Sequence, residues 1–221
     1  QATAGAGGVS DHGMLGGLTD DDHPQYLLTD GARSSTDGFA VTGSLGSGVM
    51  PVSGPGTRLM WYPRKAAFRA GGVGGSQWDD ANVGSHSVAL GASTTASGSN
   101  STAMGSGAQA TGDYTTAMGE RAIASRRAAT AMGSETVASG TASIAMGVRT
   151  TASGEFSTAM GACASTNNMQ GAFVYGDAFC TSTLDAPAWN SFTVRASGGV
   201  TFYTSTDLGA GVQLAAGSGS W

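Results

Sequence analysis

The residues of this 221-residue chain that could do chemistry are few and scattered. Three glutamates, Glu120, Glu135 and Glu155, recur in one region, and two carboxylates about 5 to 9 Å apart are what glycoside hydrolysis requires. Each glutamate occupies a variable position of a repeat, where a solvated charge is the simpler interpretation. The sequence has no nucleophile elbow, phosphate-binding loop or His-Glu-x-x-His zinc motif. We therefore predict no catalytic residue, no cofactor and no metal site.

Basic and aromatic side chains are better candidates for binding than for catalysis. Several arginines interrupt a region of small residues, and Trp61 with Tyr62 could stack on a sugar face. Packing in a core or between chains is the commoner fate of such aromatic residues. Repeated weak contacts gain affinity when several copies of a chain assemble. Six residues make up the candidate ligand-binding surface: Arg121, Arg126, Arg127, Arg149, Trp61 and Tyr62.

Two further groups could bind an ion or form a cross-link. Asp20 to Asp22 with His23 could hold a cation, although acidic residues at the start of a short helix are the plainer interpretation. Cys163 and Cys180 are too few for a disulfide framework. Two buried thiols and one bridge are equally compatible with the sequence.

Composition narrows the classes of partner. Ten Lys and Arg residues against 15 Asp and Glu give a net charge of -5, and no basic block or basic-aromatic stripe is present, so we expect no nucleic-acid binding. No apolar run reaches the 18 or so residues of a membrane span, so we expect no membrane insertion. The chain begins at Gln1, from which we expect that an upstream segment was removed. Only 11% of residues are charged, which indicates stabilisation by backbone pairing and small-residue packing.

A 14-residue repeat between residues 87 and 162 must position most of these side chains. The phrase Ala-Met-Gly, written Ala-Leu-Gly in its first copy, starts at Ala89, Ala103, Ala117, Ala131, Ala145 and Ala159. A second alanine series shares the period, at Ala96, Ala110, Ala124, Ala138 and Ala152. Self-similarity at a fixed period indicates stacked units.

One repeat is too short for a pair of helices and suits one coil of a β-solenoid, with two short strands and two turns. We expect glycine to supply the positive φ at both turns. Successive coils would pair in parallel about 4.8 Å apart. The sequence therefore predicts an all-β fold, a parallel β-roll of six 14-residue coils.

Side-chain alternation within a strand predicts an oligomer. In Thr102-Ala103-Met104 the alanine faces one side and its neighbours the other, and a coil this small admits only Ala-sized residues inside. The larger side chains then need a surface to bury against, and identical chains around one axis supply it. The alternative is a monomer with methionine inside and alanine outside. The predicted trimer core consists of Leu90, Met104, Met118, Met132, Met146 and Met160.

The repeats resemble those in the heads of trimeric autotransporter adhesins. The likeness lies in Ser87-Val88-Ala89-Leu90-Gly91, repeated as Ser-Thr-Ala-Met-Gly and interleaved with Ala-Ser-Gly, over about a third of the chain. It implies a left-handed parallel β-roll in an intimate homotrimer. The pattern departs at Arg126-Arg127, where a turn glycine is replaced, and at Thr166 to Asn168, which we expect to mark the end of the roll.

Two flanking segments resemble parts of phage tail fibres. Asp11-His12-Gly13 through Asp21-Asp22-His23-Pro24-Gln25-Tyr26-Leu27, followed by Asp30-Gly31-Ala32-Arg33, is similar to a shaft or joint segment of such fibres. Phe192 to Tyr203 and the final Gly-Ser-Gly-Ser-Trp are similar to the region ahead of the intramolecular chaperone of endosialidase-type tail spikes. Two alternating runs around Ser197 to Gly199 also predict a hairpin.

These observations predict four segments: an N-terminal helical or coil joint (1–43), a small β element (44–84), the β-roll (85–168) and a C-terminal β cap (169–221). We expect a structural and adhesive subunit of an extracellular homotrimeric fibre, either a virion tail fibre or a bacterial cell-surface appendage. The sequence leaves open whether the trimers stack end to end in a filament. The expected partners are the chain itself and a cell-surface glycan or protein receptor. A polysaccharide-degrading tail spike is the alternative function.

Overall fold

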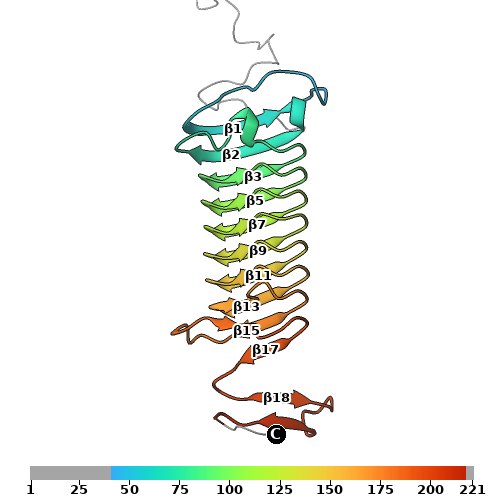
Figure 1. The fold of residues 1–221 in the computed structure, drawn as a ribbon. Coiled ribbons are helices and arrows are strands. Elements are labelled where there is room, and N and C mark those ends of the chain that lie inside the picture. Colours follow the sequence, from blue (N-terminus) through green and yellow to red (C-terminus); the bar gives the residue numbers. More distant parts are fainter. Residues whose placement is uncertain (1–40, 218–221) are drawn as a thin grey trace, which may run out of the picture. The chain divides into compact units, whose positions relative to one another are not determined.

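The computed structural model describes residues 41–217 (Figure 1). Contacts divide the chain into two units, Gln1–Val41 and Thr42–Trp221, and every element described below belongs to the second unit. The predicted N-terminal joint, with the candidate cation site at Asp20 to Asp22 and His23, lies almost entirely outside the described residues.

A ten-stranded sheet runs through this unit (Figure 1). In spatial order its strands are β1 (Gly56–Tyr62), β2 (Ala67–Val73), β3 (Val88–Ala92), β5 (Thr102–Ser106), β7 (Thr116–Glu120), β9 (Thr130–Ser134), β11 (Ile144–Val148), β13 (Thr158–Ala162), β15 (Phe173–Gly176) and β17 (Phe192–Arg195). Only β1 and β2 pair antiparallel; the other neighbours are parallel. We call this the long sheet.

A second, seven-stranded sheet of two-residue strands alternates with the first along the chain. Its strands are β4 (Thr95–Ala96), β6 (Gln109–Ala110), β8 (Ile123–Ala124), β10 (Val137–Ala138), β12 (Thr151–Ala152), β14 (Ala164–Ser165) and β16 (Leu184–Asp185). Between β3 and β13 every pairing joins residues 14 apart, such as Met104 with Met118. The predicted all-β solenoid of about six 14-residue turns is therefore confirmed.

Helical structure is minor in the described part of the chain. It consists of two three-residue 3-10 turns, η2 (Pro63–Lys65) and η3 (Asp80–Asn82). No helix within residues 41–217 has the length and apolarity needed to cross a bilayer.

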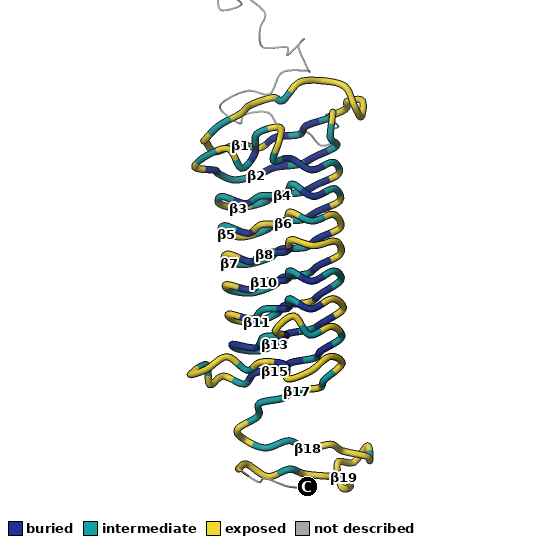
Figure 2. The backbone as a smooth tube through the Cα atoms, in the orientation of Figure 1, coloured by how far each residue is buried: buried dark blue, intermediate teal, exposed yellow. Residues whose placement is uncertain are grey.

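Alanine fills the space between the two sheets. The alanines of the Ala-Met-Gly phrases and those of the second series have no exposed surface, and they form one continuous core cluster. Figure 2 shows the buried segments recurring at the same place in successive coils. The alternative with methionine inside and alanine outside is therefore wrong, because the coil is too narrow for a longer side chain.

The turns use glycine differently from the expectation. Gly133 of the Ala-Met-Gly phrase does have positive φ, 123°. Two other left-handed positions in each coil are mostly occupied by other residues, including Asn100, Tyr114 and Arg121. The glycine of the Ala-Ser-Gly phrase is required for a different reason: a Cβ on Gly140 would lie 2.0 Å from the carbonyl oxygen of Gly154 in the next coil. Close stacking, and not a left-handed turn, selects this glycine.

Large side chains close the N-terminal end of the roll. Trp78 is fully buried in the alanine cluster and donates its indole N–H to the carbonyl of Thr94 at 2.9 Å. Arg69 is also fully buried and donates to the carbonyls of Ser87 at 2.9 Å and Ala96 at 3.0 Å. Burial lowers the pKa of the Arg69 guanidinium to about 10. The register places Arg69 beside Ala89, so it continues the inward-facing column.

The ladder continues past residue 168, where we expected the roll to end. β15 pairs with β13 over a 15-residue step, and β17 pairs with β15 over a 19-residue step. The predicted hairpin around Ser197 to Gly199 is wrong, because its first run is β17. Its second run, β18 (Val200–Tyr203), pairs instead with β19 (Gly211–Leu214) in a separate two-stranded sheet.

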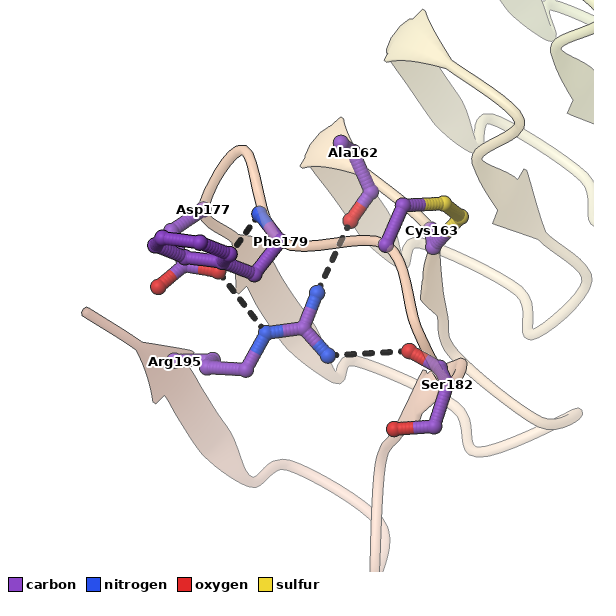
Figure 3. The surroundings of a disulfide bond; sticks show 7 residues. Ala162, Cys163, Asp177, Phe179, Ser182 and Arg195 are labelled. Atoms are coloured by element: carbon purple, nitrogen blue, oxygen red, sulfur yellow. Dashed lines mark hydrogen bonds and ion pairs between the residues drawn. A yellow bond between two sulfur atoms is a disulfide. The ribbon is translucent and has the colours of Figure 1, made fainter. Parts of the chain in front are cut away.

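A disulfide anchors residues 177–183, the segment that connects β15 to β16. Cys163 and Cys180 are bridged, with Cα atoms 5.4 Å apart, which resolves the alternative that the sequence left open. Arg195 lies beside the bridge and donates to an Asp177 carboxylate oxygen and the Ser182 carbonyl, each at 2.9 Å (Figure 3). These contacts fix the longer segments that interrupt the 14-residue period.

Candidate functional site

The outward face of the long sheet carries two parallel columns of side chains. One column joins the predicted trimer-core residues Leu90, Met104, Met118, Met132, Met146 and Met160 in register. All six are half-buried within a single chain. Each covers part of its neighbours in the adjacent coils, and the remaining apolar surface faces away from the alanine core. We call this column the methionine stripe.

The stripe extends beyond the repeats at its C-terminal end. Met160 pairs with Tyr175, and Tyr175 pairs with Val194. We did not predict these two residues as part of the stripe. The signal was present in Phe173-Val174-Tyr175-Gly176, which matches Thr-Ala-Met-Gly by size and alternation, with Val174 fully buried in place of alanine.

A second column flanks the stripe on the same face. It contains Val88, Thr102, Thr116, Thr130, Ile144, Thr158, Phe173 and Phe192. The Phe173 and Phe192 rings stack with centroids 5.1 Å apart, and Phe192 is 68% exposed. The two columns consist of aliphatic, aromatic, methionine and threonine side chains, and neither column contains a charged side chain between β3 and β15. Such a face can pack against another surface but cannot do acid-base chemistry.

The corners of the coil separate the four candidate arginines into two pairs. Arg121 and Arg149 lie at the corner between a long strand and the following short strand, with Glu135 at the equivalent position of the intervening coil. The Arg121 guanidinium contacts a Glu135 carboxylate oxygen at 2.9 Å and one of Glu120 at 4.0 Å. Two of the three candidate carboxylates therefore pair with an arginine in solvent.

Arg126 and Arg127 lie at the other corner, between the short strand β8 and the long strand β9. Both are exposed, and the Arg127 guanidinium carbon lies 5.4 Å from the centre of the Tyr114 ring. Glu155 occupies the same corner two coils further on. The structure therefore brings Arg127, the neighbour of Arg126, together with Tyr114, which lies outside the predicted set of six, and places Arg121 and Arg149 at the opposite corner.

The two aromatic candidates, Trp61 and Tyr62, are the last two residues of strand β1. Tyr62 has no exposed surface, and its hydroxyl donates to an Asp80 carboxylate oxygen at 2.8 Å. Burial, with this hydrogen bond, raises the pKa of Tyr62 above its ordinary value. Trp61 is half-buried. Tyr62 therefore cannot contact a ligand, because the antiparallel pairing of β1 and β2 turns it into the core.

Comparison with known proteins supports the assignment of residues 83–162 to a β-solenoid. Three consecutive segments, residues 83–108, 110–136 and 138–162, match the family model of the YadA head domain repeat. No curated protein matches the chain. Heads built from this repeat are homotrimeric, non-enzymatic adhesion structures of the bacterial cell surface. The matched segments are those that form the 14-residue coils from β3 to β13.

Proposed function

We propose that the chain is the adhesive head of an extracellular fibre and acts as a homotrimer whose methionine stripes meet at a common axis. The observation that carries this proposal is the position of the stripe: six long apolar side chains in register on the outside of a roll whose inside is filled by alanine. The match to a repeat of trimeric heads supports it.

The energy available from the stripe is adequate for assembly. Full burial of a methionine or leucine stabilises by about 1.5 to 3 kcal/mol, and these residues are already half-buried. Covering the remainder of six side chains therefore contributes on the order of 5 kcal/mol per chain. Tyr175, Phe173 and Phe192 enlarge the same face. Symmetric packing of three identical faces satisfies each copy equally.

Adhesion is proposed to use the exposed corners and not the stripe. The corner side chains stay in solvent when the stripes meet, and a trimer presents each of them three times, so weak contacts combine. The Cys163–Cys180 disulfide suits an extracellular location, because such bridges persist in oxidising environments. In this proposal residues 1–43 join the head to a fibre, the trimers stack end to end, and the receptor is a cell-surface glycan or protein.

Sedimentation equilibrium of the full chain tests the trimer. We expect a mass of about three times 21.7 kDa. Met118→Asp places three carboxylates at the axis and should give single chains, since desolvating unpaired charge is costly. Val137→Asp is the matched control, because Val137 is a half-buried outward residue of the short-strand sheet. A wild-type mass of one chain, or equal dissociation by both variants, contradicts the proposal.

A further inference from the structure

One coil of the roll departs from the repeat at a position where stacking is tightest. Gly98, Gly140 and Gly154 occupy this position in other coils, where a Cβ would lie 1.8 to 2.1 Å from a carbonyl oxygen of the next coil. Arg126 occupies this position in the coil of β7 and β8. The chain therefore places a large side chain where every neighbouring coil excludes even a methyl group.

The same coil also lacks a hydrogen bond that its neighbours make. Ser101, Thr115, Ser143 and Ser157 donate their hydroxyls to the carbonyl three residues earlier, at 2.6 to 2.7 Å. The equivalent residue after Arg126 is Ala129, which has no hydroxyl. Two departures that each cost stability thus coincide at one corner. Local rules that a fold otherwise obeys are broken most often at functional sites.

Tyr114, in the preceding coil, adds an exposed aromatic side chain to this corner. It adopts the left-handed conformation, with φ of 59°, as Phe156 does at the same position three coils further on. This conformation is uncommon for a bulky residue. Tyr114 is nevertheless 56% exposed, so no burial in its own chain offsets the cost. Its ring is covered on one side by Arg127, which holds both side chains in place.

Charge at the corner selects an anionic partner. No carboxylate among the described residues lies within ion-pair distance of Arg126 or Arg127, whereas Arg121 pairs with Glu135. Asp113, which occupies the position of Arg127 in the preceding coil, accepts a hydrogen bond from the Ser99 backbone N–H at 2.9 Å. Planar guanidinium groups donate paired N–H bonds to the oxygens of carboxylate or sulfate groups, and an aromatic ring offers an apolar surface to a sugar ring.

We propose that the corner formed by Tyr114, Arg126 and Arg127 is a binding site for an anionic glycan. The proposal rests on the adhesive function proposed above and names the chemical class of its receptor. Three copies of the site in a trimer strengthen binding through multivalency. The net charge of -5 on the chain makes non-specific attraction of a polyanion weak, so binding depends on this local cationic surface.

The test uses a variant that should be more stable than the parent. Arg126→Gly combined with Ala129→Ser restores the repeat, so any loss of binding cannot result from unfolding. Binding of the full chain to immobilised heparin, a sulfated glycan, and to polysialic acid, a carboxylated one, is measured at 0.15 M salt, with neutral dextran as the blank. We expect at least one of the two anionic glycans to bind, and the double variant and Arg127→Ser each to weaken that binding at least 10-fold.

Matched variants separate this site from basic side chains elsewhere and from assembly. Arg64→Ser removes one positive charge from the exposed η2 turn, outside the roll, and should change binding less than 2-fold. Tyr114→Asn keeps the left-handed conformation and should weaken binding without loss of the trimer. Unchanged binding in the Arg126 and Arg127 variants overturns the proposal, as does an equal loss in Arg64→Ser or no binding to either glycan. If the Arg127→Ser variant no longer forms a trimer, the corner belongs to the trimer interface and the glycan proposal is overturned. If the parent chain is monomeric but still binds an anionic glycan, only the proposed trimer is refuted.

Discussion

Inward-facing hydroxyls in the roll are of two kinds. Those that precede the long strands, such as Ser143, donate to a carbonyl of their own coil. Those that precede the short strands, Thr94, Thr136 and Thr150, are fully buried, and their hydroxyls have no hydrogen-bond partner among the described residues. A buried hydroxyl without a partner loses its hydration with no compensation. At the equivalent position other coils have alanine, Ala108 and Ala122, which avoids this cost.

Replacing one of these hydroxyls by a methyl group should stabilise the fold. Thr150→Val preserves shape and removes the unpaired donor, so we expect the free energy of unfolding to rise by about 1 kcal/mol. Ser143→Ala removes a satisfied hydroxyl and should lower it by about 1 kcal/mol. Urea unfolding at one fixed protein concentration measures both changes. A Thr150→Val protein less stable than its parent would show that this hydroxyl is hydrogen-bonded in solution.

A single carboxylate near the C-terminal end should contribute to acid sensitivity. The backbone N–H of Ser197 and the Arg195 guanidinium hold the pKa of Asp177 at about 2. A pKa lowered by folding stabilises the folded state at pH above about 4, and this contribution is lost as the pH falls towards 2. Asp177→Asn should therefore lower stability at pH 6 and flatten the decline between pH 4 and 2.

Unfolding free energies measured between pH 2 and 6 check this prediction. Asp185→Asn is the control, because Asp185 is an exposed carboxylate in β16 with no ion pair among the described residues. A pH profile of Asp177→Asn that parallels the parent would mean that the Arg195 and Ser197 contacts do not persist in solution.

At the scale of the coil, stacking distance is more demanding than turn conformation. Gly133 and Gly107 both have positive φ, 123° and 66°. A Cβ on Gly133 would meet the Gly147 carbonyl oxygen at 2.0 Å, whereas one on Gly107 would be 3.7 Å from its nearest neighbour, a methylene of Arg121. The two glycines therefore separate the cost of close approach from the cost of a left-handed backbone.

Alanine substitution at these two positions should give very different results. We expect Gly133→Ala to destabilise by about 3 kcal/mol or more, because two coils must move apart. Gly107→Ala should cost about 1 kcal/mol, the usual cost of a left-handed alanine. Thermal unfolding monitored by circular dichroism compares them. Similar losses in both variants would contradict the role assigned to coil spacing.

The repeat was sufficient to predict the coils, because each 14-residue unit has the same pattern of alanine, methionine and glycine. Period-2 alternation identified alanine as the inward residue, and the excess of methionine on the outside followed from size. What the sequence did not reveal lies where insertions of one and five residues break the period. There we expected the roll to end near residue 168 and assigned the run of β17 to a hairpin. The burial of Tyr62 depends on which strands pair, and the contact between Tyr114 and Arg127 depends on which corner of the coil each residue occupies. Neither the strand pairing nor the corner positions can be derived from residue spacing alone.

At the scale of the whole molecule, a solenoid leaves both faces of each sheet to be covered. The alanine core satisfies the inner faces, while the methionine stripe and the column beside it remain only partly covered on the outer face of the long sheet. In a repeat architecture each coil contacts only its neighbours, so stability grows with the number of rungs. Covering the outer face by two other copies adds contacts that a single chain cannot make.

Stability of the full chain should therefore depend on its concentration. If folding and trimerisation are linked, the melting temperature rises as protein concentration rises, because only the folded state assembles. Met132→Ala removes apolar contact at the proposed axis in three copies and should lower the melting temperature more at low than at high concentration. Ile123→Ala, a half-buried outward residue of the short-strand sheet, should lower it equally at both. Scanning calorimetry over a 100-fold range of concentration distinguishes these outcomes, and a melting temperature independent of concentration in the parent chain would place the stripe outside the interface.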